Sequence, residues 1–134
     1  MAVLTGDQEY RKKAMALLES ASSFFAVYPQ GFGHWLGALD LALASPMEVA
    51  VVGPLHDPST GSLLRTIHSR FLPNRLLVGR DPADADIFPT PILEGRKAVD
   101  GLATAYVCHG YVCELPTTDP SLLDALLSQP VPGG

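Results

Sequence analysis

The hydrophobic pattern of this chain changes its period at Ser45 and Pro46, and this change restricts the fold more than any other feature. Before it, over residues 7–27 and 32–44, apolar side chains recur at the spacing of amphipathic helices. After it, residues 48–52 form a short apolar run rich in β-branched side chains, which is typical of a strand buried on both faces. Two helices joined by a short loop, and therefore antiparallel neighbours, are expected to precede a sheet.

The second part of the chain has the element order of a βαβ unit. A helical pattern over residues 59–72 follows the first strand, and a second apolar run lies at residues 75–78. Strands joined through such a helix are parallel. A third strand is predicted at residues 103–108, and Asp119 followed by Pro120 predicts the start of a last helix. The expected fold is α/β: two N-terminal helices, then a small, mainly parallel sheet of about three or four strands with a βαβ unit and flanking helices.

The same pattern suggests how the chain is divided. We expect a helical hairpin over residues 1–45 and a small α/β domain over residues 46–134. Residues 79–102 show no hydrophobic period and contain several prolines, so only a short helical turn near residues 82–87 is expected there. Residues 111–115 either continue the third strand or return as the second arm of a hairpin.

Composition excludes several classes of protein. The 134 residues carry a formal net charge of −5, and the 9 Lys and Arg residues form no basic stripe that could bind nucleic acid. No segment has the length and purity of a transmembrane helix, and the N-terminus lacks the pattern of a secretory signal, so we expect no membrane association and a cytoplasmic location. With 47% hydrophobic residues the chain can bury a core, while the low charged fraction of 17% suggests that part of the surface faces another domain.

Residues 108–113 contain the closest grouping of reactive side chains, because Cys108, His109 and Cys113 are close in sequence. In one continuous strand the two thiols would point to opposite faces, about 16 Å apart, and could not bridge. In a hairpin they would face each other and could form a disulfide. Two buried structural thiols are the favoured interpretation, because unpaired cysteine is usually a core residue. A reversible disulfide and a metal site are alternatives, but zinc needs four ligands, so no metal ligand is assigned.

The loop after the first predicted strand is a candidate ligand site. Ligands of parallel sheets bind beyond the carboxyl ends of the strands, and the N-terminus of the next helix could hold a phosphate. Gly53, His56, Asp57 and Thr60 are the candidate residues, for a nucleotide or a sugar. Neither glycine-rich phosphate fingerprint is present, which favours a plain loop, and no cofactor is assigned.

Polar residues in the second helix and in one loop are the remaining candidates. His34 and Asp40 lie about 120° apart around the helix axis, so they form no pair within it, but either could face a cavity supplied by another domain. Asp81, Asp84 and Asp86 form an acidic loop without the spacing of a calcium site, so a solvated loop is expected. The sequence contains no self-contained set of nucleophile and base, and we expect no enzymatic activity from this chain alone.

Several short motifs together resemble one family. They are, in chain order, Tyr28-Pro29, Phe32-Gly33-His34, Ala38-Leu39-Asp40, Glu48-Val49-Ala50-Val51-Val52-Gly53, Phe71-Leu72-Pro73-Asn74-Arg75, Val99-Asp100-Gly101, Thr104-Ala105-Tyr106-Val107-Cys108, and Cys113 followed by Pro116-Thr117-Thr118-Asp119-Pro120. With these motifs the chain resembles, over almost its whole length, the C-terminal region of thioredoxin-domain-containing proteins related to spermatogenesis-associated protein 20. The motifs between the third strand and the last helix are the most specific part of this resemblance.

The resemblance implies a three-part plan for the whole protein: a thioredoxin-like domain, a toroid of helical hairpins similar to N-acylglucosamine 2-epimerases and six-hairpin glycosidases, and a C-terminal segment like this one. The other domains would then be the partners of this chain, and a small carbohydrate a candidate ligand. On this basis we expect a non-catalytic C-terminal domain in which His34, Trp35 or Asp40 line the cavity of the toroid. The alternative is a thiol redox role for Cys108 and Cys113, together with the thiols of the thioredoxin-like domain.

Overall fold

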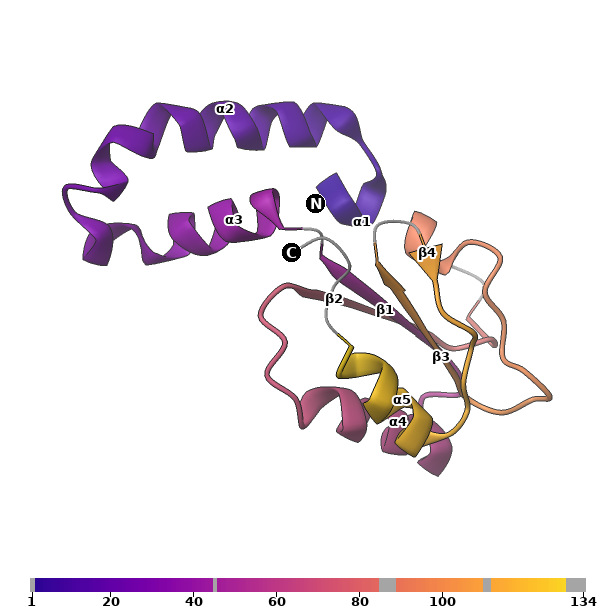
Figure 1. Cartoon of the computed structure of the whole chain (residues 1–134). Coiled ribbons are helices and arrows are strands. Elements are labelled where there is room, and N and C mark those ends of the chain that lie inside the picture. Colours follow the sequence, from indigo (N-terminus) through magenta and orange to yellow (C-terminus); the bar gives the residue numbers. More distant parts are fainter. Residues whose placement is uncertain (1, 45, 85–88, 110–111, 130–134) are drawn as a thin grey trace.

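A computed structural model shows the architecture of the chain and describes residues 2–44, 46–84, 89–109 and 112–129 (Figure 1). The helices are α1 (Ala2–Thr5), α2 (Gln8–Phe25), α3 (Gly33–Leu43), α4 (Pro58–His68) and α5 (Pro120–Leu127), with two short 3-10 turns, η1 (Pro29–Phe32) and η2 (Pro91–Leu93). The strands are β1 (Met47–Val52), β2 (Arg75–Arg80), β3 (Thr104–His109) and β4 (Val112–Cys113). The predicted α/β class, with helices first and the sheet after them, is confirmed.

The two long N-terminal helices form the predicted hairpin. Asp7 caps α2, because its carboxylate accepts a hydrogen bond from the Glu9 backbone N–H at 2.8 Å. The turn η1 then reverses the chain, and α2 and α3 lie side by side, extending away from the sheet (Figure 1). At the turn, the Phe32 ring packs between Phe25 and Trp35, with ring centroids 5.5 Å and 6.3 Å away.

The sheet has the strand order β2-β1-β3-β4. β1 and β2 are parallel, as predicted for the βαβ unit, whereas β1 pairs with β3 and β3 with β4 in antiparallel fashion. The sheet is therefore mixed, and the expectation of a mainly parallel sheet is corrected. The reason lies in the connection after β2, which delivers Thr104 beside Val52, at the carboxyl end of β1, so that β3 must run back along it.

One face of the sheet carries the larger core. α4 and α5 lie together on this face (Figure 1), and the buried side chains are Met47, Val49, Val51, Leu63, Ile67, Ala103, Ala105, Val107, Leu123 and Leu127. α4 begins at Pro58 and ends at His68, four residues before the predicted end at Leu72. Phe71 therefore lies outside the helix and is 91% exposed.

The opposite face is covered by the segment that showed no hydrophobic period. Ile92 and Leu93 of η2 pack on Ala50 and Val52 of β1. Leu4 of α1 adds to this second cluster, and α1 contacts η2 directly. The helical turn predicted near residues 82–87 falls partly outside the described residues, while η2, which the sequence analysis did not predict, lies a few residues later.

Candidate functional site

The register of three strands places one carboxylate and two sulfurs in a row. Glu48 of β1 is paired with Cys108 of β3, and Cys108 is paired with Cys113 of β4. Directly paired residues in a sheet share a face, so all three side chains lie on the face covered by η2. His109, next along β3, is on the other face and is paired with Met47.

Cys108 and Cys113 are joined by a disulfide, with their α-carbons 3.9 Å apart. The hairpin alternative is therefore confirmed, and the favoured interpretation of two unpaired thiols is wrong. Both sulfurs are bonded to each other and His109 lies on the opposite face, so these three side chains do not converge as a set of ligands. Across the described part of the chain, no cluster of His, Cys, Asp or Glu side chains is suited to hold a metal ion. Cys108 is fully buried, whereas Cys113 is exposed.

Arg96 lies against both sulfurs of the disulfide. Its Nη2 donates to the Sγ of Cys108 at 2.9 Å and to the Sγ of Cys113 at 3.3 Å. The guanidinium also stacks over the Tyr106 ring, 5.5 Å from its centroid. Sequence reasoning missed Arg96, because it lies in the segment without a hydrophobic period and reaches the cysteines only through the tertiary fold.

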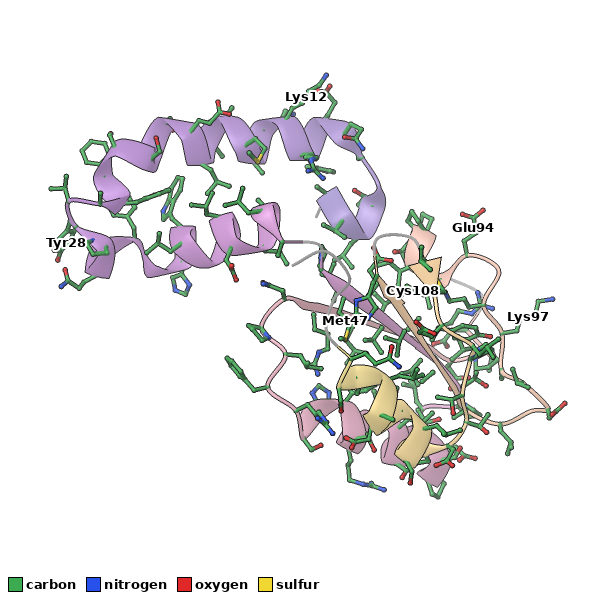
Figure 2. The ribbon with its side chains drawn as sticks, viewed as in Figure 1. Lys12, Tyr28, Met47, Glu94, Lys97 and Cys108 are labelled. Carbon is green, nitrogen blue, oxygen red and sulfur yellow. A yellow bond between two sulfur atoms is a disulfide. The ribbon has the colours of Figure 1, made fainter. Side chains whose placement is uncertain are left out.

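Tyr106 is itself held in place by the residue after Arg96. Its hydroxyl donates to the backbone carbonyl of Lys97 at 2.7 Å and accepts from the Lys97 backbone N–H at 3.3 Å. The Lys97 side chain extends outward from the loop after η2, while Cys108 lies on β3 (Figure 2). Arg96 and Lys97 are therefore neighbouring cations of which only Arg96 is directed to the sulfurs.

The charges of Arg96 and Glu48 beside the disulfide compensate each other only in part. Burial lowers the pKa of Arg96, and the charge of the Glu48 carboxylate opposes this effect. Burial likewise raises the pKa of Glu48, and Arg96 opposes that rise. Within the described part of the chain, the Nη1 atom of Arg96 is buried and has no hydrogen-bond partner. In the described structure the guanidinium therefore keeps a buried N–H group without an acceptor.

A cavity of about 450 Å³ opens beside the disulfide. Its wall on the sheet side includes Glu48, Arg96 and Cys113, and its other wall includes Asp7 and Arg11 at the start of α2. The exposed cysteine, the guanidinium and the carboxylate are thus accessible from one side.

In the loop after β1, the candidate ligand residues take part in packing and helix capping. Gly53 is buried, and a β-carbon there would lie 2.7 Å from the Thr60 hydroxyl oxygen. Asp57 caps α4 by accepting from the Ser59 backbone N–H at 2.7 Å, and hydrogen bonds from Ser59 lower the pKa of Asp57. Thr60 is buried and His56 is exposed. Gly53 and Thr60 are thus buried at the packing contact, whereas His56 and Asp57 are exposed, and a ligand role for the loop stays a prediction.

The three candidates on α3 are also separated from one another. Trp35 lies on the inner side of the hairpin, where it lines an apolar cavity of about 550 Å³ between α2, α3 and α1. His34 and Asp40 are exposed, and the Asp40 carboxylate accepts a hydrogen bond from the Asn74 side chain at 2.9 Å. α3 extends away from the sheet (Figure 1), and His34 is not among the described residues that line the cavity beside the disulfide.

The predicted acidic loop is partly described. The Asp81 carboxylate accepts backbone N–H bonds from Leu55 and Ala83, both at 2.9 Å. These bonds lower the pKa of Asp81, with a smaller contribution from the charge of His56. Asp84 is exposed, and Asp86 lies outside the described residues.

Comparison with known proteins yields one group of relatives. Human spermatogenesis-associated protein 20 is 28% identical over 125 residues, which is 92% of this chain. The rat protein is 28% identical over 128 residues, and the mouse protein is 27% identical over 127 residues. The chain spans about 16% of the length of these curated relatives. The predicted resemblance therefore extends over almost the whole chain.

Two other comparisons gave no match. No family model and no solved structure matches the chain. Among the helices described by the structure, none combines the length and the apolar character needed to cross a membrane.

Proposed function

We propose that this chain is the C-terminal α/β domain of a larger protein related to spermatogenesis-associated protein 20, and that its helical hairpin packs against the rest of that protein. The proposal includes the division into a hairpin over residues 1–45 and an α/β domain over residues 46–134. The relatives support it, because a match over more than nine tenths of this chain covers only 16% of their length. Their names state no ligand, so the carbohydrate suggested by the resemblance stays a prediction.

The exposed apolar side chains of the hairpin carry the proposal. Of α2 only Leu18 and Ala21 are buried, and α3, as described, contains no buried residue. Leu17 is 58% exposed, Phe24 57% and Val27 80%. Apolar side chains left in contact with water on this scale indicate a surface that another protein segment covers.

Connections between the hairpin and the sheet are few, which agrees with a hairpin that belongs to a neighbouring domain. α1 rests on η2, and the Asp40 carboxylate accepts one hydrogen bond from Asn74. Trp35, which lines the apolar cavity of the hairpin, is the best placed of the three α3 candidates to contact a further helix. We keep a cavity-lining role for His34, Trp35 and Asp40 as part of the proposal.

The size of the natural polypeptide tests this function. An antibody raised against residues 46–134 should detect, in cells that express the gene, a polypeptide several times longer than 134 residues. A species of 134 residues as the sole product would overturn the proposal.

Paired substitutions then test the covered surface. Replacing both Leu17 and Val27 by Glu should leave the melting temperature of the 134-residue chain nearly unchanged, because both side chains are already exposed. In the longer polypeptide the same pair should lower the melting temperature. The control Lys12→Gln, which removes only an exposed ion pair with Glu9, should not. Equal behaviour of the two variants in the longer polypeptide would contradict packing through this surface.

A further inference from the structure

We propose that the Cys108–Cys113 disulfide is a site of thiol–disulfide exchange, in which a low-molecular-weight thiolate attacks the Cys113 sulfur and Arg96 stabilises the departing Cys108 thiolate. This activity is independent of the packing role proposed above. It rests on three features of the described residues: unequal access to the two sulfurs, a guanidinium in contact with both, and a cavity beside the exposed one.

The two sulfurs differ in access. Cys113 is exposed and lines the cavity of about 450 Å³, whereas Cys108 is fully buried beneath it. Access is one of the factors that decide which sulfur a thiolate attacks in an exchange reaction. A thiolate entering through the cavity therefore meets Cys113, and Cys108 becomes the leaving group.

Arg96 is placed where the leaving group would form. Its Nη2 is 2.9 Å from the Cys108 Sγ, closer than to the Cys113 Sγ at 3.3 Å. A disulfide sulfur is a weak, neutral acceptor, whereas a thiolate in the same position would accept a charge-assisted hydrogen bond. A leaving thiol whose thiolate is stabilised departs faster. The hydrogen bond from Arg96 to the Cys108 sulfur is therefore stronger after the disulfide opens than before.

The surroundings hold the guanidinium in this position. It stacks on Tyr106, whose hydroxyl is fixed by two hydrogen bonds to the Lys97 backbone. Its Nη1 is buried and, as far as the structure describes the chain, has no acceptor. The charge of Glu48 compensates the half-buried guanidinium only in part. An anionic sulfur at position 108 would complete this compensation.

The exchange balances in atoms and electrons. In the first step a new S–S bond forms between the attacking sulfur and Cys113 as the Cys108–Cys113 bond breaks, and the electron pair leaves on the Cys108 sulfur. A second thiolate attacks the small-molecule sulfur of the mixed disulfide, which releases the Cys113 thiolate and a small-molecule disulfide. The protein disulfide gains two electrons, two thiols are oxidised, and the protein thiolates take protons from water. In a reducing compartment, such as the cytoplasm predicted from the sequence, disulfides are usually transient species of this kind.

Trapping the mixed disulfide tests the direction of attack. The folded, oxidised 134-residue chain is incubated with reduced glutathione, quenched with N-ethylmaleimide, and mapped by fragmentation mass spectrometry. Glutathione on Cys113 together with maleimide on Cys108 is expected. Glutathione on Cys108, or no reduction unless denaturant is added, would overturn the proposal.

Substitution of Arg96 tests the stabilising contact. In Arg96→Gln, the pH midpoint for alkylation of the reduced thiols should rise by about one unit, and exchange at neutral pH should slow about threefold. The matched control Lys97→Gln removes a neighbouring charge and should change the rate less than about twofold, while Arg96→Lys should restore part of the loss. Equal effects of Arg96→Gln and Lys97→Gln would overturn the assigned role.

If Arg96→Gln does not fold, the role of Arg96 can still be tested on the wild-type chain. The reduced wild-type chain should show an alkylation midpoint below the value of about 8.5 for free cysteine. A midpoint at or above that value would mean that burial of Cys108 outweighs the contact with Arg96, and would overturn the proposed stabilisation of the leaving thiolate.

Discussion

Gly53 and Ala103 approach so closely that a β-carbon at position 53 would lie 2.6 Å from the Ala103 β-carbon and 2.9 Å from its α-carbon. Gly53 follows β1, Ala103 precedes β3, and Thr60 of α4 contacts the same point. The missing side chain allows the ends of two strands and a helix to meet. The glycine considered as part of a ligand loop is therefore used for packing.

Substitution of Gly53 by Ala should destabilise the fold by about 1–3 kcal/mol, because the added methyl group meets backbone that cannot move away. Gly37→Ala is the matched control, since a β-carbon at Gly37 would meet no described atom within 4 Å apart from its chain neighbours and the backbone of α3 itself. That change should stabilise the chain by up to about 1 kcal/mol through the better helix propensity of alanine. Urea denaturation of both variants measures the difference, and a neutral Gly53→Ala would contradict the close contact.

Two adjacent leucines of α5 should respond differently to truncation. Leu123 is fully buried against the sheet, whereas Leu122 is 58% exposed. Leu123→Ala should cost about 2–5 kcal/mol, because it removes buried methyl groups and leaves a cavity, and Leu122→Ala should stay within about 0.5 kcal/mol of the wild type. Equal free energies of unfolding for the two variants would show that α5 does not cover the sheet as described.

Stability in acid should depend on Asp81. Its folded-state pKa lies below the ordinary value of 3.8, because the carboxylate accepts backbone hydrogen bonds from Ala83 and Leu55. Between these two values the unfolded chain binds more protons, so stability rises with pH. The contribution is complete above pH 3.8 and is lost as the pH falls below it, through the lower folded-state value.

Asp81→Asn removes this group from the titration, so the loss of stability with falling pH should be shallower than in the wild type. Asp84→Asn removes an equal charge from the same loop and leaves both hydrogen bonds to Asp81 in place. Melting temperatures measured across the acidic range compare the two variants. Parallel curves for Asp81→Asn and the wild type would count against the hydrogen bonds to Asp81.

Much of the fold is encoded in local signals that a single sequence reveals. Asp119 and Pro120 predict the start of α5, where the Asp119 carboxylate accepts from the Ser121 N–H at 2.7 Å. The same Asp–Pro pair starts α4 at Asp57 and Pro58, although the helical pattern was predicted to begin one residue later, at residue 59. These signals act within one turn of helix, so they need no knowledge of the tertiary fold.

The features that sequence reasoning missed depend on contacts between distant segments. The direction of β3 is set by a connection without hydrophobic period. The hydrophobic pattern alone therefore predicts a mainly parallel sheet. Whether Cys108 and Cys113 face each other depends on a hairpin, and a two-residue strand such as β4 is too short to show an alternating pattern. Arg96 reaches the sulfurs across 12 and 17 residues of sequence, beyond the range of any motif.

Reduction of the Cys108–Cys113 disulfide should lower the free energy of unfolding without unfolding the chain. The two cysteines are 5 residues apart, and the constraint that so short a loop places on the unfolded chain amounts to about 2 kcal/mol. The β1–β2 and β1–β3 pairings do not pass through the disulfide, so the core should persist in the reduced protein. Urea denaturation with and without reductant measures this difference, and Cys113→Ser, which has no disulfide, should be insensitive to reductant. Complete unfolding of the wild type by reductant alone would mean that the bridge, and not the packed sheet, holds this chain together.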